Sequence, residues 1–500
     1  MTTTPDPRLG GRRRFGLQVV VSGSAQAGRA IQQFVILVVI TKLLGAEPYG
    51  VWSQVAVTIG LLSPLGMLLL EPAMVRFLPE AGDQRRERQL LLRFGLLTLG
   101  GSAVIGAVLL LVAAPLLRLV TDGEAALPYV RLIAAMIAAE GLIVLVLAFW
   151  RARGRIGRFA AASLGRDLGS AAVISAIGLG GGDVRAVLTG YVVYSWIYAL
   201  VVFLLSALRR GWPGVTMSGA ARQIRFVGPL VLNHPLGWAG KYANVYVISL
   251  LLGAGSVGVY SSARHLTDVL GLLSGPILLV LAPALAKLYV RGEMGEVRDY
   301  MTGAISYYLL GALPLAAAVT IYAEPVLRLV SSGAIAVSGA PLVPWLASAM
   351  VFMGTYSILA ESAYLTRRTW FFPPVWTLLA VAQITLNLVL VPRLGLLGSA
   401  VAECAGAAVV LCCGAGLAHR ALGLRPDILE AVKLVGAALL AFALTVVIDA
   451  QRTGGGLAVF AGVYLAALAA LRVHTFRRLF QRTLKMSGRI PRPAEVQHRP

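Results

Sequence analysis

The amino-acid sequence predicts an all-α, polytopic membrane protein, on the basis of its composition, the length of its apolar segments and an internal repeat. Of the 500 residues, 58% are hydrophobic and only 13% are charged. The mean hydropathy is +0.80. Soluble domains typically contain about 45–50% apolar and about 25% charged residues. The composition therefore excludes an ordinary soluble protein.

Apolar segments of membrane-spanning length follow one another along the whole chain. A hydrocarbon core of about 30 Å requires roughly 20 consecutive apolar residues per helix. About fourteen transmembrane helices are predicted, at 17–43, 51–78, 90–119, 129–150, 159–180, 186–208, 226–252, 256–288, 300–323, 341–365, 370–391, 396–418, 430–449 and 456–471. The connections between them are short, which excludes a separate soluble catalytic domain.

The positive charge is concentrated in alternate connections between these segments. The formal net charge is +22, from 44 Lys and Arg against 22 Asp and Glu. Most of the cations lie in residues 1–14, 76–93, 151–166, 209–225, 287–298, 367–368, 420–433 and 472–500. Because Lys and Arg are enriched in cytoplasmic loops, this alternation predicts a multi-pass protein of the cell (inner or plasma) membrane with both termini cytoplasmic.

The chain also repeats itself. LLGAEPYGVWS at 43–53 returns as LLGAGSVGVYS at 251–261, and AAPLLRLV at 113–120 returns as AEPVLRLV at 323–330. Each repeat holds six predicted helices, and an even number returns the chain to the same side of the membrane. Parallel repeats are related by a pseudo-two-fold axis along the membrane normal. We therefore expect two lobes around a central cleft, followed by two additional helices.

The repeat divides the chain into predicted parts. They are a cytoplasmic basic tail (1–14), an N-lobe of helices 1–6 (15–208), a cytoplasmic linker (209–225), a C-lobe of helices 7–12 (226–420), helices 13–14 (421–472) and a basic cytoplasmic tail that we expect to be disordered (473–500).

A family resemblance is visible in three motifs: the turn LLGAEPYGVWS at 43–53, its repeat at 251–261 and the basic segment RFLPEAGDQRRER at 76–88. In these motifs the chain resembles the polysaccharide transporters of the multidrug/oligosaccharidyl-lipid/polysaccharide exporter superfamily. The resemblance implies a flippase that moves polyprenyl-pyrophosphate-linked oligosaccharide from the inner to the outer leaflet by alternating access. It also implies the lipid-linked oligosaccharide and membrane lipids as partners, with a polysaccharide polymerase or glycosyltransferases as further partners and no nucleic acid. The second helix lacks the mid-span arginine of the lipid II flippases, which disfavours that substrate.

Polar side chains inside the apolar segments mark the candidate site, because an ionisable group at mid-bilayer costs roughly 2.5–3.5 kcal/mol on insertion scales. The first helix carries a polar stripe on one helical face, made of Gln18, Ser22, Gln26, Arg29 and Gln33. We expect this face to line the cleft, with Gln26, Arg29 and Gln33 as substrate ligands. The alternative for Arg29 is a structural ion pair with an acid on a neighbouring helix.

The seventh and eighth helices carry a second polar set. Lys241 and Asn244 lie mid-span in the seventh helix, after His234 and Pro235, and we expect Lys241 and Asn244 to bind substrate. Arg264, His265 and Asp268 follow in the eighth. Arg264 and His265 are further candidate ligands, although an i,i+4 salt bridge between Arg264 and Asp268 is the simpler interpretation.

Four acids are candidates for coupling or gating: Glu71, Glu140, Asp268 and Glu403. A buried carboxylate can carry a proton or a sodium ion. Equally, Glu140 and Glu403 can bond a neighbouring helix, and Glu71 can form an ion pair at the membrane interface.

Two other functions remain alternatives. A cation-coupled multidrug antiporter of the same superfamily would favour acids over bases in its cleft, and Arg29, Lys241 and Arg264 argue against it. A polytopic glycosyltransferase or polymerase is expected to carry a long outer loop with acids or His, whereas the outer loops here are short. The sequence contains no P-loop, catalytic nucleophile constellation or metal-ligand spacing, and Cys404, Cys412 and Cys413 share one apolar stretch. We expect no cofactor and no enzymatic activity.

Overall fold

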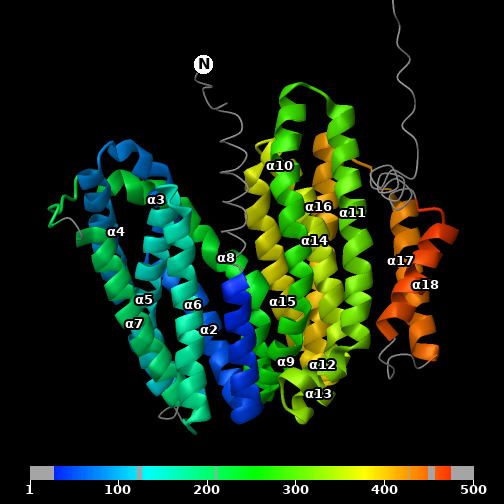
Figure 1. Cartoon of the computed structure of the whole chain (residues 1–500), viewed down its shortest axis with the longest axis horizontal. Helices are drawn as coiled ribbons and strands as arrows, with labels where there is room; N and C mark the ends of the chain where they lie inside the picture. The colour runs from blue at the N-terminus through cyan, green and yellow to red at the C-terminus, as the bar shows by residue number, and fades with distance from the viewer. Residues whose placement is uncertain (1–26, 121–126, 209–210, 426, 449–455, 474–500) are drawn as a thin grey trace, which may run out of the picture. The chain divides into compact units, whose positions relative to one another are not determined.

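The computed structural model describes residues 27–120, 127–208, 211–425, 427–448 and 456–473, and at 113–120 it describes the backbone alone. Helices account for the regular structure of these residues, which contain no β-strand (Figure 1). This agrees with the predicted all-α fold. A helix satisfies its backbone N–H and C=O groups internally, as long apolar segments in a membrane require.

The described chain forms two compact units, with the division after Gly258. Unit 1 contains the helical residues 27–43, α2 (Ala46–Gly66), α3 (Leu70–Phe77), η1 (Leu78–Ala81), α4 (Gln84–Val120), α5 (Leu127–Ala152), α6 (Ile156–Leu179), α7 (Val184–Leu208), α8 (Ala220–Leu252) and the start of α9 (Ala254–Thr267). Residues Val330–Ser332 also belong to unit 1.

Unit 2 contains the rest of α9 and the later helices. These are η2 (Asp268–Leu273), α10 (Ser274–Val290), α11 (Met294–Ile321), α12 (Ala323–Val330), α13 (Gly333–Gly339), η3 (Ala340–Leu342), α14 (Val343–Leu365), η4 (Thr369–Phe371), α15 (Phe372–Leu394), α16 (Leu396–Leu422), α17 (Ile428–Val447) and α18 (Gly456–Ala470). The predicted linker at 209–225 overlaps the start of α8, and α8 belongs to unit 1.

Helical residues occupy part or all of each of the fourteen predicted segments, but the number of membrane passages is not confirmed. Among the described residues, nine helices are long and apolar enough to cross a membrane. A tenth span results if α2 is joined to α3 and η1, which follow it at a 46° bend. Charged and polar residues lower the hydropathy of α6 and α8, and α18 is short.

One helix lies at the centre of each unit. In unit 1, α5 contacts α2, α3, α4, α6 and α7. In unit 2, α14 contacts α10, α11 and α16. These are the fourth helices of the two predicted repeats, and both are rich in fully buried side chains. Polar groups on the buried faces of these helices are therefore held away from lipid.

The two helices beyond the repeats pack against each other and against α11. Leu434, Ala437 and Ala441 of α17 and Phe460 of α18 share an apolar core with Ile321. The Tyr464 hydroxyl donates a hydrogen bond to the Leu310 carbonyl oxygen at 3.1 Å. This packing assigns α17 and α18 to unit 2.

Candidate functional site

A buried ionic cluster joins α5 and α6 in unit 1. The Arg166 guanidinium lies 2.7 Å from the Glu140 carboxylate and 3.7 Å from the Asp167 carboxylate. The Arg166 and Glu140 side chains are 13% and 14% exposed, and that of Asp167 is 1% exposed. Charges at this depth require partners, because desolvating an ion costs several kcal/mol. The cluster therefore ties α6 to the central helix of the unit.

The helical residues 27–43 lie against the same part of α6. Arg29 interacts electrostatically with Asp167, and the amide of Gln32 donates a hydrogen bond to the Ser170 hydroxyl at 2.6 Å. Gly28 packs closely against the Leu164 side chain. Arg29 and Gln33 are themselves exposed. Gln26, with the rest of the predicted stripe before it, lies outside the described residues.

This cluster corrects one reading of the sequence and adds a residue to the candidate site. The charge pattern grouped Arg166 with the cytoplasmic cations of 151–166, but its side chain is buried and paired. Asp167 was missed altogether. The available signal was the adjacent opposite charges in the middle of an apolar segment. For Glu140, the structure shows the helix-bonding contact that the sequence left as an alternative to coupling.

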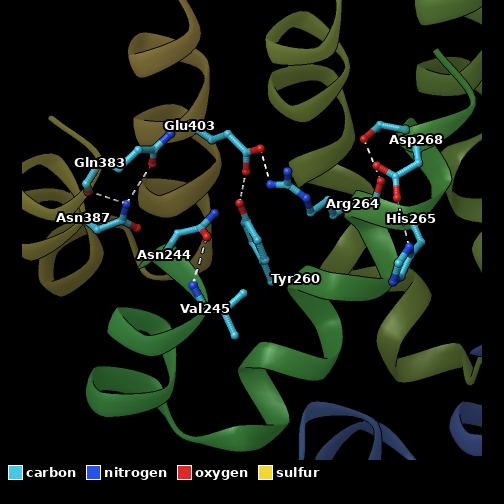
Figure 2. Close-up of polar contacts among 10 residues, drawn as sticks. Asn244, Val245, Tyr260, Arg264, His265, Asp268, Gln383, Asn387 and Glu403 are labelled. Atoms are coloured by element: carbon cyan, nitrogen blue, oxygen red, sulfur yellow. Dashed lines mark hydrogen bonds and ion pairs between the residues drawn. The ribbon is translucent and has the colours of Figure 1, made fainter. Parts of the chain in front are cut away.

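A second buried cluster lies in unit 2. Arg264 and Tyr260 of α9 both point toward Glu403 of α16 (Figure 2). The guanidinium pairs with the carboxylate, and the Tyr260 hydroxyl donates a hydrogen bond to it. All three residues are buried. Glu403 therefore has a cross-helix partner, and Arg264 carries a neutralised charge.

Asp268 does not continue the α-helix that carries Arg264, although the sequence predicts both residues on one helix. Asp268 begins the 3-10 segment η2, and its carboxylate lies 3.0 Å from Nδ1 of His265 (Figure 2). The predicted partner of Arg264 was Asp268, four residues along the chain. The partner that the structure identifies is Glu403, on another helix. His265 and Asp268 are both partly exposed.

The α15 helix carries an amide pair beside this region of unit 2. The Asn387 side-chain amide donates to the Gln383 carbonyl oxygen at 2.7 Å and to its Oε1 at 3.3 Å (Figure 2). Both residues are buried. They were not among the predicted site residues, although two polar residues at i,i+4 in an apolar segment provide a visible signal.

The predicted site residues of α8 differ in exposure. Lys241 is exposed, and its Nζ lies 5.1 Å from the ring centroid of Tyr242. Asn244 is buried, and its Oδ1 accepts a hydrogen bond from the Val245 backbone N–H at 3.0 Å. His234 keeps a buried Nε2 with no hydrogen-bond partner among the described residues. Of these three residues of α8, Lys241 is thus an exposed cation, whereas Asn244 and the His234 Nε2 atom are buried polar groups.

Glu71 lies at the start of α3 and forms an ion pair with Arg151 at 2.5 Å. Both side chains are partly exposed. The nearer cation in sequence, Arg76, pairs instead with Glu80 at 2.8 Å. An ion pair is therefore present at Glu71, as the interfacial interpretation expects, and its partner comes from the end of α5.

In the described part of the chain, the His, Cys, Asp and Glu residues form no group of three or more that is placed to hold a metal ion. Cys404, Cys412 and Cys413 are free thiols.

Solved structures of transporters share this fold. The lipid II flippase MurJ, in an inward closed conformation, aligns with a TM-score of 0.69 and 12% identity over 92% of this chain and 100% of that chain. An inward-facing multidrug resistance MATE-family transporter of the MOP superfamily aligns with a TM-score of 0.60 and 15% identity, over 79% and 94% of the two chains. A MOP superfamily transporter from Pyrococcus furiosus aligns with a TM-score of 0.56 and 15% identity, over 82% and 95%.

At these identities the likeness shows the fold. Together with the apolar helices of unit 1 and unit 2, it identifies a multi-pass membrane protein. A search among curated proteins finds no match. The polysaccharide biosynthesis protein family model, however, matches residues 17–289, more than half of the chain. The chain therefore belongs to the polysaccharide biosynthesis protein family.

Proposed function

We propose that this protein is a transporter that flips polyprenyl-pyrophosphate-linked oligosaccharide from the inner to the outer leaflet, for cell-surface polysaccharide biosynthesis. The family assignment supports a role in polysaccharide biosynthesis. The fold, shared with flippases and multidrug transporters, supports transport by alternating access between two lobes. On this proposal the protein lies in the cell membrane with both termini cytoplasmic and carries no catalytic step.

The observation that carries the proposal is the exposure of Arg29 and Lys241 in segments that the sequence predicts to span the membrane. A cation exposed there needs water or an anionic ligand, because lipid would penalise it by roughly 2.5–3.5 kcal/mol on insertion scales. A pyrophosphate supplies multiple negative charge, and Arg binds phosphate through two parallel hydrogen bonds. Arg264 differs from these two, because Glu403 neutralises it.

The other predicted site residues take subordinate roles on this proposal. Gln26, Gln33, Asn244 and His265 would bind substrate oxygens beside the two cations. Glu71, Glu140, Asp268 and Glu403 would act in gating or coupling through the charges that they contact. Release of Arg264 from Glu403 when substrate arrives would add a third cation to the binding set.

The test is a leaflet-exchange assay on the purified full-length protein in proteoliposomes. A fluorescent polyprenyl-pyrophosphate oligosaccharide is placed in both leaflets, and an impermeant reagent reports the fraction that remains accessible. The proposal expects exchange well above that of protein-free vesicles. Exchange equal to protein-free vesicles would refute it.

A second candidate is a cation-coupled multidrug antiporter, and the buried carboxylate of Asp167 favours it. Such carboxylates are the groups that bind a coupling proton or sodium ion in a membrane. The same vesicles distinguish the two functions. An antiporter would accumulate a lipophilic organic cation when a proton or sodium gradient is imposed, and would leave the lipid-linked oligosaccharide in its original leaflet.

A further inference from the structure

Three arginines from two helices line a pocket in unit 1 that includes no residue of the two buried ionic clusters. The pocket has a volume of about 280 Å³ and is lined by Arg76, Phe77, Arg222, Arg225 and Phe226. Arg76 and Phe77 end α3, whereas the other three belong to the first two turns of α8. Segments far apart in the sequence therefore build one basic, aromatic-lined site.

The charge of this pocket is only partly compensated. Glu80 pairs with Arg76 at 2.8 Å and with Arg222 at 3.4 Å. Arg225 makes no hydrogen bond or ion pair with any residue that the structure describes. Arg222 and Arg225 also lie near the N-terminus of α8, where the helix dipole disfavours cations and favours an anion. A bound anion would relieve both sources of unfavourable charge.

Aromatic rings hold two of the guanidinium groups in place. The Arg222 guanidinium lies 5.0 Å from the Phe77 ring centroid, and that of Arg76 lies 5.9 Å from it. Phe77 in turn meets Phe226 edge to face at 5.6 Å. A guanidinium that stacks on a ring keeps its N–H groups available at its edge for phosphate oxygens.

The segment before α8 is fixed to α4, which fixes the pocket as well. Arg93 donates hydrogen bonds to the Thr216 carbonyl oxygen at 2.5 Å and to Gln223 at 3.3 Å. Gln89 donates to the Pro213 carbonyl oxygen at 2.8 Å. Gly219 then adopts a left-handed conformation, with φ 84°, directly before α8 begins. These hydrogen bonds therefore fix the start of α8, and with it the positions of Arg222 and Arg225.

Exposed apolar side chains in the segment that leads into α8, and in the pocket itself, support the placement of the pocket at the membrane surface. Trp212 is 68% exposed and Met217 is 50% exposed, both in the segment that leads into α8. Phe226, within the pocket, is 43% exposed. Trp is enriched where a protein meets the lipid head groups. A phosphate that reaches this pocket at the level of the lipid head groups would belong to a lipid.

We propose that Arg76, Arg222 and Arg225 form a binding site for the phosphate head group of a membrane lipid. Phosphate oxygens would accept hydrogen bonds from the three guanidinium groups, and the adjoining apolar part of the lipid would pack on Phe226. Two lipids offer this chemistry, an anionic phospholipid and a polyprenyl-pyrophosphate carrier. The second would make the pocket a capture site for substrate, and only that outcome rests on the proposed transport function.

The test measures lipid binding by the purified full-length protein in neutral detergent, without any transport step. The probes are fluorescent phosphatidylglycerol, farnesyl pyrophosphate and inorganic pyrophosphate. Phosphatidylcholine, which is zwitterionic and carries no net charge, is the reference. The variant Arg222→Gln/Arg225→Gln removes two guanidinium groups. Its matched control, Lys287→Gln/Arg291→Gln, removes the same charge from exposed residues of another predicted cytoplasmic connection.

The proposal expects phosphatidylglycerol or farnesyl pyrophosphate to bind the wild type and the control, and to bind the Arg222→Gln/Arg225→Gln variant at least about tenfold more weakly. Arg222→Lys/Arg225→Lys should recover part of the affinity, which separates loss of the site from loss of folding. Equal lipid binding by wild type and the Gln variant would overturn the proposal. So would binding of inorganic pyrophosphate without binding of either lipid. Because transport is not measured, a failed flippase assay leaves this result intact.

Discussion

Gly50 of α2 and Gly258 of α9 lie at a crossing where neither helix has room for a side chain. A Cβ atom at Gly50 would overlap the carbonyl oxygen of Ala254, and a Cβ atom at Gly258 would overlap the carbonyl oxygen of Ala46. The contact is reciprocal, and Ala46 and Gly50 correspond to Ala254 and Gly258 in the two copies of the repeat. Small residues four apart let membrane helices approach closely. The repeated motif is thus explained by packing.

Substitution of either glycine by alanine should destabilise the protein. The overlapping atoms belong to the backbone, so the helices must move apart, and overpacking of this kind typically costs about 1–3 kcal/mol. Gly60→Ala, in the same helix, is the control because its Cβ would meet open space. Thermal unfolding in detergent should show a lower Tm for Gly50→Ala and Gly258→Ala. An unchanged Tm for both would contradict the crossing.

Removal of Glu140 should be more harmful than removal of a surface acid. Glu140→Ala leaves the buried Arg166 without its closest carboxylate, and breaking a buried pair costs about 3–5 kcal/mol. Glu80→Ala breaks exposed pairs and should cost about 0–1 kcal/mol. The measurement is the free energy of unfolding of each variant in the same detergent. If Glu140→Ala and Glu80→Ala lowered the free energy of unfolding by similar amounts, the Glu140–Arg166 contact would not be buried.

The partner of Arg264 can be tested by comparing two acids. Glu403→Gln removes the carboxylate that pairs with Arg264 and accepts from Tyr260, so we expect a clearly lower Tm. Asp268→Asn changes a partly exposed group and should alter the Tm little. Tyr260→Phe removes the hydrogen bond to the Glu403 carboxylate and should cost about 1.5–3 kcal/mol. A larger effect from Asp268→Asn than from Glu403→Gln would restore the partner that the sequence suggested.

The start of α4 should loosen at acidic pH. The backbone N–H of Arg86 donates a hydrogen bond to the exposed Asp83 carboxylate at 2.7 Å and lowers the pKa of Asp83 below its usual value. A group whose pKa falls on folding stabilises the folded state above its unfolded pKa, and this contribution disappears as the pH falls through the folded pKa. Hydrogen exchange at the Arg86 amide should therefore lose protection in that acidic window. Asp83→Asn, which keeps the acceptor oxygen, should make the protection independent of pH there.

Local sequence rules predicted the helices well because apolar length and repeat spacing are one-dimensional properties. Partners of buried charges depend on how helices are rotated against each other. The i,i+4 rule therefore pointed from Arg264 to Asp268, whereas the contact with Glu403 joins residues far apart in the chain. In the same way, counting cations by segment placed Arg166 in the cytoplasm, although its rotation toward α5 buries it. Asp167 was missed because its neighbour was assigned to a loop.

The most direct test of the account is leaflet exchange of a polyprenyl-pyrophosphate oligosaccharide by wild type, Arg29→Ala, Lys241→Ala and Lys42→Ala in proteoliposomes. Lys42 is an exposed cation at the end of the helix that carries Arg29, so its variant is the matched control. The account predicts that Arg29→Ala and Lys241→Ala each reduce the exchange rate at least about tenfold, because a charge-assisted hydrogen bond is worth about 1.5–3 kcal/mol, while Lys42→Ala retains the wild-type rate. Wild-type exchange by both Arg29→Ala and Lys241→Ala would contradict the account.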